Sequence, residues 1–357
     1  MRIVFVGAGH ASLLALRALG PLPGTELTLI SDGPRAHYSG MVPGWIEGLY
    51  GDGAMDVPLA AFAAAHGLTF LDARVGEITE DAVLTDGGPV AYDHLVLNTG
   101  AVAAPIAAGP APASLIPAKP FSALLAGLGR QLDSAASFAI VGAGAAGTEV
   151  AFAIRRRRPD AAITLVEARA QILSAFPATF RRRVGRHLAA AGIGVRTGTA
   201  PCGADDGGVH LADGTLVSAA CTLAFTGAAP PPLLAAAPFA KAPDGFIATD
   251  RSMRSLSHPH VLAVGDTATT VDDPRPKAGV FAVRQGRPLA RAIRALAAGR
   301  TPPPVHLQRH ALVLLSVGAR RAIGVRNGLV VEGRAVWQLK DRLDRRFIAR
   351  LTAPPRR

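Results

Sequence analysis

The first hydrophobic pattern in the chain is an apolar run, a glycine-rich turn and a second apolar stretch. Residues 2–6 (RIVFV) are apolar from Ile3 onward, as in a buried parallel strand, and residues 13–19 have the apolar content of a packed helix. Between them stands GAGHAS at residues 7–12, and a second strand pattern follows at residues 26–30 (ELTLI). The pattern predicts a strand, a tight turn, a helix and a parallel strand in that order.

The same pattern occurs again in the middle of the chain. Residues 137–141 predict a strand and residues 142–147 (GAGAAG) a glycine turn. Residues 148–156 then predict a helix and residues 163–166 the next strand. Because both copies share one context, we interpret them as two units of the same kind.

Both glycine turns predict dinucleotide binding. The first glycine permits the sharp bend, the second lets the backbone approach a pyrophosphate, and the helix N-terminus presents unpaired N–H groups to it. An acidic residue, which would accept ribose hydroxyls, follows 23 positions after the second glycine in each copy. The first copy gives the candidates Gly7, Gly9, His10, Ala11 and Asp32, and the second gives Gly142, Gly144, Gly147 and Glu167.

The acidic residue of the second unit favours NADH. Glu167 can accept two ribose hydroxyls, whereas it would repel a 2′-phosphate. Arg169 stands two residues later and keeps NADPH open as the alternative. Two dinucleotides in one chain are most simply explained by hydride transfer from a nicotinamide to a flavin.

The last part of the chain changes its pattern. Residues 312–331 predict strands with a hairpin turn at Asn327-Gly328. Apolar side chains then recur at spacings of three and four with arginines between them, which predicts an amphipathic basic helix. They are Val336, Leu339, Leu343, Phe347 and Leu351. Such a helix docks on an anionic membrane surface, or else it packs against the body of the protein or a second subunit of a homodimer.

Composition limits the classes of protein. A chain of 357 residues is long enough for two or three domains. No apolar run of about 18 residues and no secretory signal pattern is present, so we expect a cytoplasmic protein, with a peripheral position on the inner membrane face as the alternative. The net charge of +12 is carried by arginine, without zinc-finger spacing or a basic aromatic strand, and predicts no nucleic-acid binding. Cys202 and Cys221 are the only cysteines and predict neither a disulfide framework nor a metal site.

Three further motifs carry a resemblance to a known family. Residues 261–267 (VLAVGDT) predict a strand that ends at Gly265-Asp266. Residues 92–100 (YDHLVLNTG) and 223–227 (LAFTG) resemble the connecting motifs by which a chain leaves the FAD domain and the NAD domain of two-dinucleotide-binding-domain flavoproteins. With the two glycine turns in order, the chain resembles the two-dinucleotide-binding-domain flavoproteins, specifically the branch of type II NADH dehydrogenases and sulfide:quinone reductases.

The resemblance implies an α/β fold with two Rossmann-like dinucleotide-binding domains and a small C-terminal α+β region. Residues 1–102 and 243–300 would form a discontinuous FAD-binding domain, residues 103–242 an inserted NAD(P)H-binding domain, and residues 301–357 a C-terminal interface domain. The resemblance adds to the FAD set Thr99, Gly100, Gly265, Asp266, Lys277, Ala278 and Gly279, and to the NAD(P)H set Gly227.

Two side chains are candidates for catalysis. Lys277, one of four lysines, precedes a predicted helix whose N-terminus points at the flavin pyrimidine in the family. There a cation would stabilise reduced flavin; the alternative is an exposed loop lysine. Glu149 matches a family glutamate on the N5 side of the flavin, where it helps to bind nicotinamide or handles a proton for the acceptor. The alternative is a glutamate that only favours the helix dipole.

A narrower resemblance is carried by residues 38–44 (YSGMVPG) with Tyr50, and by residues 337–347 (WQLKDRLDRRF). Both are similar to the domain found N-terminal to selenide, water dikinase, and residues 38–44 would form a loop over the flavin or acceptor. Disulfide reductases of the superfamily carry a Cys-x4-Cys pair near the flavin, whereas no cysteine precedes Cys202 here. Electrons would therefore pass directly to a quinone or similar small acceptor. The alternative is a redox partner that delivers electrons to a protein or to a selenium or sulfur pathway enzyme.

Overall fold

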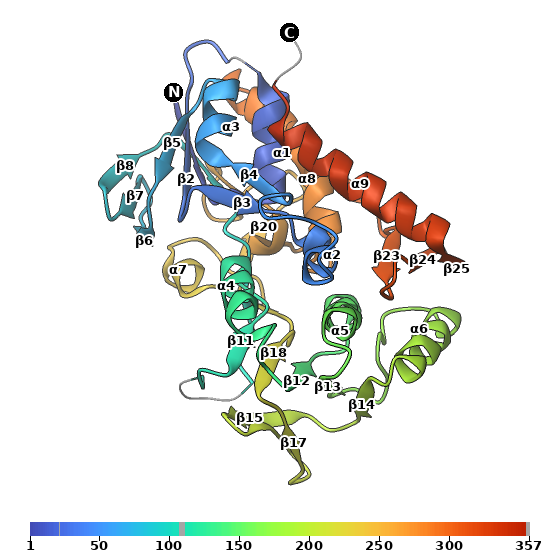
Figure 1. The fold of residues 1–357 in the computed structure, drawn as a ribbon. Coiled ribbons are helices and arrows are strands. Elements are labelled where there is room, and N and C mark those ends of the chain that lie inside the picture. Colours follow the sequence, from blue (N-terminus) through green and yellow to red (C-terminus); the bar gives the residue numbers. More distant parts are fainter. Residues whose placement is uncertain (21, 107–110, 355–357) are drawn as a thin grey trace.

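Two five-stranded parallel sheets dominate the computed structural model, which describes residues 1–20, 22–106 and 111–354 (Figure 1). The first sheet has the order β21-β9-β1-β2-β5. Its strands are β1 (Arg2–Val6), β2 (Glu26–Ser31), β5 (Thr69–Asp72), β9 (His94–Leu97) and β21 (Val261–Ala263). The last strand comes from far along the chain, so this sheet is assembled from two separate segments.

Three helices accompany the first sheet, namely α1 (His10–Leu19), α3 (Leu59–His66) and α8 (Gly279–Ala297). Helices α1 and α8 pack side by side (Figure 1). Gly286 makes this close approach possible, since a Cβ there would lie 2.4 Å from the Leu14 side chain. The N-termini of the two helices therefore lie near each other at the same edge of the sheet.

The second sheet has the order β11-β18-β12-β13-β14. Its strands are β11 (Leu115–Pro117), β12 (Ser137–Val141), β13 (Ala162–Glu167), β14 (Gly194–Thr197) and β18 (Cys221–Ala224). Its helices are α4 (Phe121–Gln131), α5 (Ala145–Arg157) and α6 (Ala178–Ala190). All of its strands pair in parallel, as their continuous apolar character requires.

Short elements complete the body. Two small sheets are three-stranded and antiparallel. One consists of β6 (Val75–Ile78), β7 (Ala82–Thr85) and β8 (Gly88–Ala91), and the other of β15 (Pro201–Asp205), β16 (Gly208–Leu211) and β17 (Leu216–Ser218). Two-stranded pairs join β3 (Arg35–His37) to β4 (Asp56–Pro58), β10 (Val102–Ala103) to β19 (Ala228–Ala229), and β20 (Ile247–Thr249) to β22 (Ala268–Thr270). The remaining helical pieces are η1 (Ser39–Met41), α2 (Val42–Ile46), α7 (Pro232–Ala236) and η2 (Gly265–Thr267).

The chain ends in a three-stranded antiparallel sheet followed by a long helix. The elements are β23 (Val313–Ser316), β24 (Ala322–Arg326), β25 (Leu329–Gly333) and α9 (Arg334–Thr352). Asn327 and Gly328 both have positive φ, of 49° and 81°, as the predicted two-residue hairpin turn requires. Figure 1 shows α9 running along the first sheet's helices from the β23–β25 sheet.

The prediction of a single apolar stripe on the last helix is wrong. Leu339 and Leu343 are 45% and 44% exposed, whereas the buried face carries Lys340 and Asp344. Burial of these two charged side chains is tolerated because they pair with each other at 2.8 Å. Apolar packing of the helix comes from Val336 near its start and from Phe347, Ile348 and Leu351 in its last turns.

The loop predicted at residues 38–44 also differs from prediction, since the chain is helical from Ser39 onward. They fold as the 3-10 turn η1 followed by α2. Pro43 fits in the first turn of α2, where no backbone N–H is needed. The glycines and proline therefore mark a compact helical corner rather than a loop.

The architecture confirms the predicted α/β class with two parallel Rossmann-like sheets and a small C-terminal α+β region. In the described parts of the chain, no helix is both long and apolar enough to cross a membrane.

Candidate dinucleotide sites

The first glycine turn follows β1 and is closed on one side by Asn98. Gly7 has φ of 95°, and a Cβ there would lie 2.4 Å from the backbone oxygen of Asn98. At Gly9 an added Cβ would lie 2.5 Å from the side chain of the same asparagine. Both positions therefore require glycine, and Asn98 in turn donates to Ser12 Oγ at 3.1 Å.

Two helix N-termini meet beside this turn. Helix α1 starts at His10, with Ala11 buried behind it, and α8 starts at Gly279 after Ala278. A Cβ on Gly279 would lie 3.5 Å from His10 Nδ1, so the two helix starts are in direct contact. Each N-terminus carries partial positive charge and unpaired N–H groups, which suit an anionic group such as a pyrophosphate.

The ends of β9 and β21 contribute further groups. Gly100 N donates to Thr267 Oγ1 at 2.9 Å, and Gly265 N donates to Gln285 Oε1 at 2.6 Å. Asp266 lies between these contacts in η2. The hydroxyl Oγ1 of Thr99 is buried without a hydrogen-bond partner among the described residues. Asp32 is exposed just beyond β2.

These observations fit FAD. The glycine turn has no space for a side chain, two helix N-termini are in contact beside it, and a buried hydroxyl is left for an outside partner. FAD would supply a flavin that accepts a hydride and releases electrons. The chain's own part would be to hold the pyrophosphate at the first turn and the ribityl group near Asp266.

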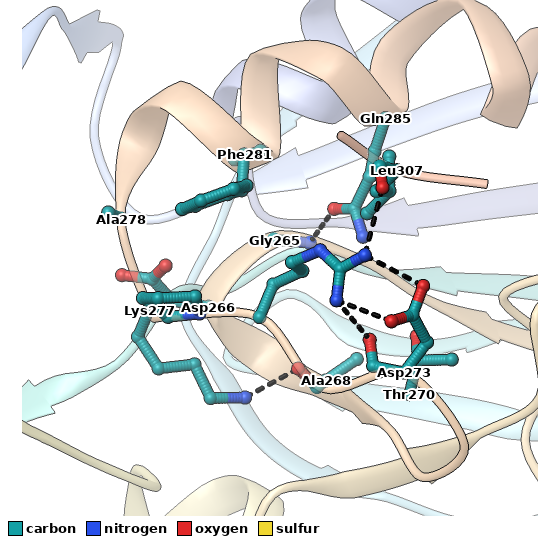
Figure 2. A pocket seen from close by; sticks show the side chains of 13 residues that line it. Gly265, Asp266, Ala268, Thr270, Asp273, Lys277, Ala278, Phe281, Gln285 and Leu307 are labelled. Carbon is teal, nitrogen blue, oxygen red and sulfur yellow. Dashed lines mark hydrogen bonds and ion pairs between the residues drawn. The ribbon is translucent and has the colours of Figure 1, made fainter. Parts of the chain in front are cut away.

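The side chain of Lys277 makes its polar contacts with other residues of the chain (Figure 2). Its ammonium group donates to Ala268 O at 2.5 Å and Thr269 Oγ1 at 2.7 Å, and lies 3.9 Å from the centre of the Phe246 ring. Burial lowers the pKa of Lys277 to about 8, although Asp244 and Asp266 act in the opposite direction. Its role toward the flavin stays a prediction.

Lys119 is a site residue that sequence reasoning missed. It lies between β11 and α4, and its ammonium group forms an ion pair with the carboxylate of Asp266. Proximity of Lys119 also contributes to lowering the pKa of Lys277, so both lysines are near the same carboxylate. Only the rarity of lysine could have drawn attention to Lys119, because lysine occurs at four positions in the chain.

The second glycine turn repeats the first. Gly142 has φ of 102°, and its Cβ would lie 2.1 Å from Phe225 O; a Cβ on Gly147 would lie 2.1 Å from Gly142 O. At Gly144, by contrast, an added Cβ would meet nothing within 4 Å. Gly144 therefore leaves open the space over the N-terminus of α5, where a dinucleotide phosphate would approach.

Glu167 closes the second turn at the end of β13. Its carboxylate accepts from Ala143 N and from Arg169 N, both at 3.1 Å. Thr148 Oγ1 is buried and has no partner within the described residues. Gly227, with φ of 106°, accepts from Ala104 N through its carbonyl at 3.2 Å and so joins the two connecting segments. This set fits a second dinucleotide.

Glu149 belongs to a buried polar cluster rather than to an exposed helix start. Its carboxylate accepts from Ser316 N at 2.8 Å, and burial raises its pKa although Lys340 acts in the opposite direction. Lys340 donates to Gly40 O at 2.7 Å and to Asp344 at 2.8 Å. Tyr38 donates its hydroxyl to Asp344 at 2.9 Å. We call these four side chains, Tyr38, Glu149, Lys340 and Asp344, the acid–lysine cluster.

The cluster continues to the first glycine turn through aromatic rings. Tyr38 stacks on Phe347 with ring centres 4.3 Å apart, and His10 meets both rings edge-on at 5.4 and 5.3 Å. Burial lowers the pKa of His10 to about 4, so its ring is neutral at pH 7. The candidate FAD turn and the candidate acceptor-side glutamate are therefore connected by packed side chains.

Glu47 is near enough to Glu149 for the two charges to interact, and it gives a pH prediction. Burial raises its pKa to about 7, against the opposing effect of Arg156, so the folded chain keeps a proton that the unfolded chain loses above about pH 4.5. The free energy of unfolding should therefore fall as pH rises from 4.5 to 7. We expect Glu47→Gln to remove this slope, a relative gain of about 1–2 kcal/mol at pH 8 after allowing for solvent screening. Urea unfolding at pH 5 and pH 8 measures it, and parallel behaviour of both proteins would contradict it.

Both cysteines lie in the second unit, away from the first glycine turn. Cys202 is exposed on β15, and Cys221 is buried on β18, where burial raises its pKa to about 12. A thiol of that pKa is not a nucleophile at neutral pH.

Taken with the fold, the two glycine turns define two candidate dinucleotide sites, one on each parallel sheet. A model of the pyridine nucleotide-disulphide oxidoreductase family matches residues 1–286. The chain belongs to the pyridine nucleotide-disulphide oxidoreductase family. It is therefore a flavin-dependent pyridine nucleotide oxidoreductase, with FAD implied by the family.

Individual proteins show the same similarity. The chain is 27% identical over 330 residues to rhodocoxin reductase from Rhodococcus erythropolis, covering 86% of this chain and 73% of that protein. The sulfide:quinone oxidoreductase structure from Aquifex aeolicus has a TM-score of 0.80 at 19% identity, covering 98% and 91% of the two chains. NDH2 from Plasmodium falciparum, in complex with NADH, has a TM-score of 0.82 at 13% identity and covers 99% of both chains. The two structures support the fold alone.

Proposed function

We propose that the protein takes a hydride from NADH onto FAD and passes the electrons directly to a quinone or a similar small acceptor. The observation that carries this is the lack of any cysteine near the first glycine turn, since both cysteines lie on β15 and β18. With no thiol pair to receive electrons, they leave the flavin for an acceptor outside the chain. The FAD residues are those of the first turn with Thr99, Gly100, Gly265 and Asp266, and the NADH residues are those of the second turn with Glu167 and Gly227.

The acid–lysine cluster would serve the acceptor side. A quinone takes up protons with its electrons, and Glu149 has a carboxyl whose pKa burial raises, which favours the protonated form that can donate to an acceptor. Burial opposes the charge of Lys340, but the carboxylates of Glu149 and Asp344 outweigh it and raise the pKa of this lysine. Lys340 would thus stay protonated and position Glu149 rather than compete with it.

Stopped-flow spectroscopy tests the proposal directly. We expect the purified protein to be yellow, its flavin to be bleached faster by NADH than by NADPH without oxygen, and its colour to return when menadione is added. Flavin that NADH cannot reduce would contradict the hydride step. Rapid bleaching without reoxidation by quinone would instead contradict the acceptor.

A second candidate is a redox partner that delivers electrons to a protein. It is favoured by the similarity to rhodocoxin reductase and by the net charge of +12, which suits an acidic partner. The narrower resemblance to the domain N-terminal to selenide, water dikinase would direct the electrons to selenium or sulfur chemistry. Slow turnover with quinones and fast turnover with an acidic iron–sulfur protein would favour this candidate.

Helix α9 offers a place for peripheral membrane association. Leu339 and Leu343 are exposed on it, and Arg342 and Arg346 are exposed next to them. Two leucines give a small apolar contact, so binding would depend on anionic lipid and fall with salt. Alternatively, the exposed leucines contact a second subunit. Liposome sedimentation at two salt concentrations and a solution mass measurement separate the two.

A further inference from the structure

We propose that Lys119 is an electrostatic residue of the flavin site, whose ammonium group favours the anionic, reduced form of FAD. The proposal rests on the proposed FAD site and deepens it. It gives to Lys119 a role that the family resemblance implies for Lys277. Three observations carry it: where Lys119 is held, what it contacts, and where the ammonium group of Lys277 is directed.

Lys119 is fixed at the junction between the two sheets. Its carbonyl accepts from Ala103 N at 3.3 Å, which ties it to β10, and the neighbouring Ala118 N donates to Ala224 O at the end of β18. Both β10 and the end of β18 belong to the segments that connect the two units. The backbone of Lys119 is therefore anchored on the second sheet's side, while its side chain reaches the first.

The contact that the side chain makes is with the carboxylate inferred to hold FAD. Lys119 Nζ pairs with Asp266 Oδ2, and the two side chains are 32% and 17% exposed. Asp266 itself is held in η2, where Gly265 N donates to Gln285 and Thr267 accepts from Gly100 N. The ammonium group thus lies beside a partly desolvated point at the start of α8, where a charge acts more strongly than in water.

Lys277 is directed elsewhere. Its ammonium group is bound to Ala268 O and Thr269 Oγ1 and lies over the Phe246 ring, with Asp244 as its nearest carboxylate at 3.9 Å. Figure 2 shows its side chain running away from the start of α8 toward Ala268. Of the two lysines near Asp266, Lys119 is thus the one in direct contact with it.

A consequence is that a residue of one unit would raise the reduction potential of the flavin bound to the other unit. Reduced flavin carries negative charge on its pyrimidine ring, and a cation close to it raises the reduction potential. Because Lys119 is anchored on the segment that carries the NADH-binding sheet, the potential of the flavin would depend on that sheet being docked. A purely structural ion pair between the two units is the alternative.

Sulfite provides a test that needs no turnover. Its sulfur lone pair forms a bond to N5 of oxidised flavin, and the resulting negative charge on the ring is stabilised by a nearby cation. We expect Lys119→Met to weaken sulfite binding to the FAD-loaded protein roughly tenfold, the order of effect of removing one nearby unit charge at an effective dielectric constant of about 20. The midpoint potential, measured against a reference dye, should fall in the same variant.

Two variants serve as controls. Lys119→Arg keeps the charge and should bind sulfite as the unaltered protein does. Lys241→Met removes another partly buried lysine, one bonded to Ala237 O and Phe239 O, and should leave sulfite binding unchanged. If Lys119→Met melts at a lower temperature but binds sulfite normally and keeps its potential, the ion pair is structural and the proposal is overturned.

The experiment separates this proposal from the proposed function. An unaltered protein that takes up no FAD, or whose FAD is not reduced by NADH, contradicts the proposed function. Should Lys119→Met fail to fold, Lys119→Gln and Lys119→Arg are compared instead. Equal sulfite affinity in those two variants would overturn the role of the charge.

Discussion

Gly142→Ala is expected to abolish the second nucleotide site by destroying the turn itself. The new methyl group would lie 2.1 Å from the Phe225 backbone oxygen, at a φ of 102° that side chains rarely adopt. Strain of this kind, with a backbone clash that no side-chain motion relieves, should cost about 3 kcal/mol or more of folding free energy. Thermal unfolding of the purified variant, or its insolubility, measures the effect.

Gly144→Ala is the matched control because its effect should be the opposite. An added Cβ there meets nothing within 4 Å, and φ of −73° suits alanine. We expect unfolding to change by no more than about 1 kcal/mol, whereas NADH affinity falls roughly 100-fold, as loss of about 2–3 kcal/mol of phosphate contacts implies. If both variants lose NADH binding without loss of stability, the two glycines do not have the separate roles described.

Removing the buried lysine of the acid–lysine cluster should give the second large effect. In Lys340→Met, Asp344, only 6% exposed, keeps Tyr38 but loses its cation, and Gly40 O loses a donor. Breaking a buried ion pair from one side typically costs about 3–5 kcal/mol. Urea unfolding of the FAD-loaded protein at pH 7 checks this.

A double variant separates the pair from the packing. In Lys340→Met with Asp344→Asn neither member of the pair carries a charge, and the amide oxygen can still accept from Tyr38, so the loss should be smaller than for Lys340→Met alone. Arg345→Ala is the surface comparison: Arg345 pairs with Asp341 at 3.0 Å but is 57% exposed, and its removal should cost no more than about 1 kcal/mol. A double variant as unstable as the sum of its parts would contradict the charge argument.

The parts of the site that sequence patterns predicted are those whose signal is local. A strand, a turn without space for side chains and a helix follow one another within about twenty residues, so the local sequence predicts the roles of Gly7, Gly142 and their neighbours. The same holds for the hairpin at Asn327-Gly328, where two positive φ values need residues that tolerate them.

The parts that were missed depend on contacts between distant segments. Lys119 and Asp266 are 147 positions apart, and Tyr38 and Asp344 are 306 apart. The spacing of apolar residues on the last helix gave a wrong prediction because the buried face of that helix is also decided by contacts with a distant segment. The helix buries Lys340 and Asp344 because their hydrogen-bond partners, Tyr38 and Gly40, lie on another segment of the chain. A prediction from hydrophobic periodicity assumes instead that charged residues face solvent.

The assembly of the first sheet has a consequence for biosynthesis. β9 ends at Leu97 and β21 begins at Val261, so the strand that covers one edge of β9, and helix α8 that covers α1, are translated only after the whole second sheet. During translation the second sheet can close while the first still exposes the edge of β9 and the apolar side of α1. Until α8 emerges, the nascent chain therefore offers a site for chaperones or for aggregation, and its first nucleotide pocket is the last to mature.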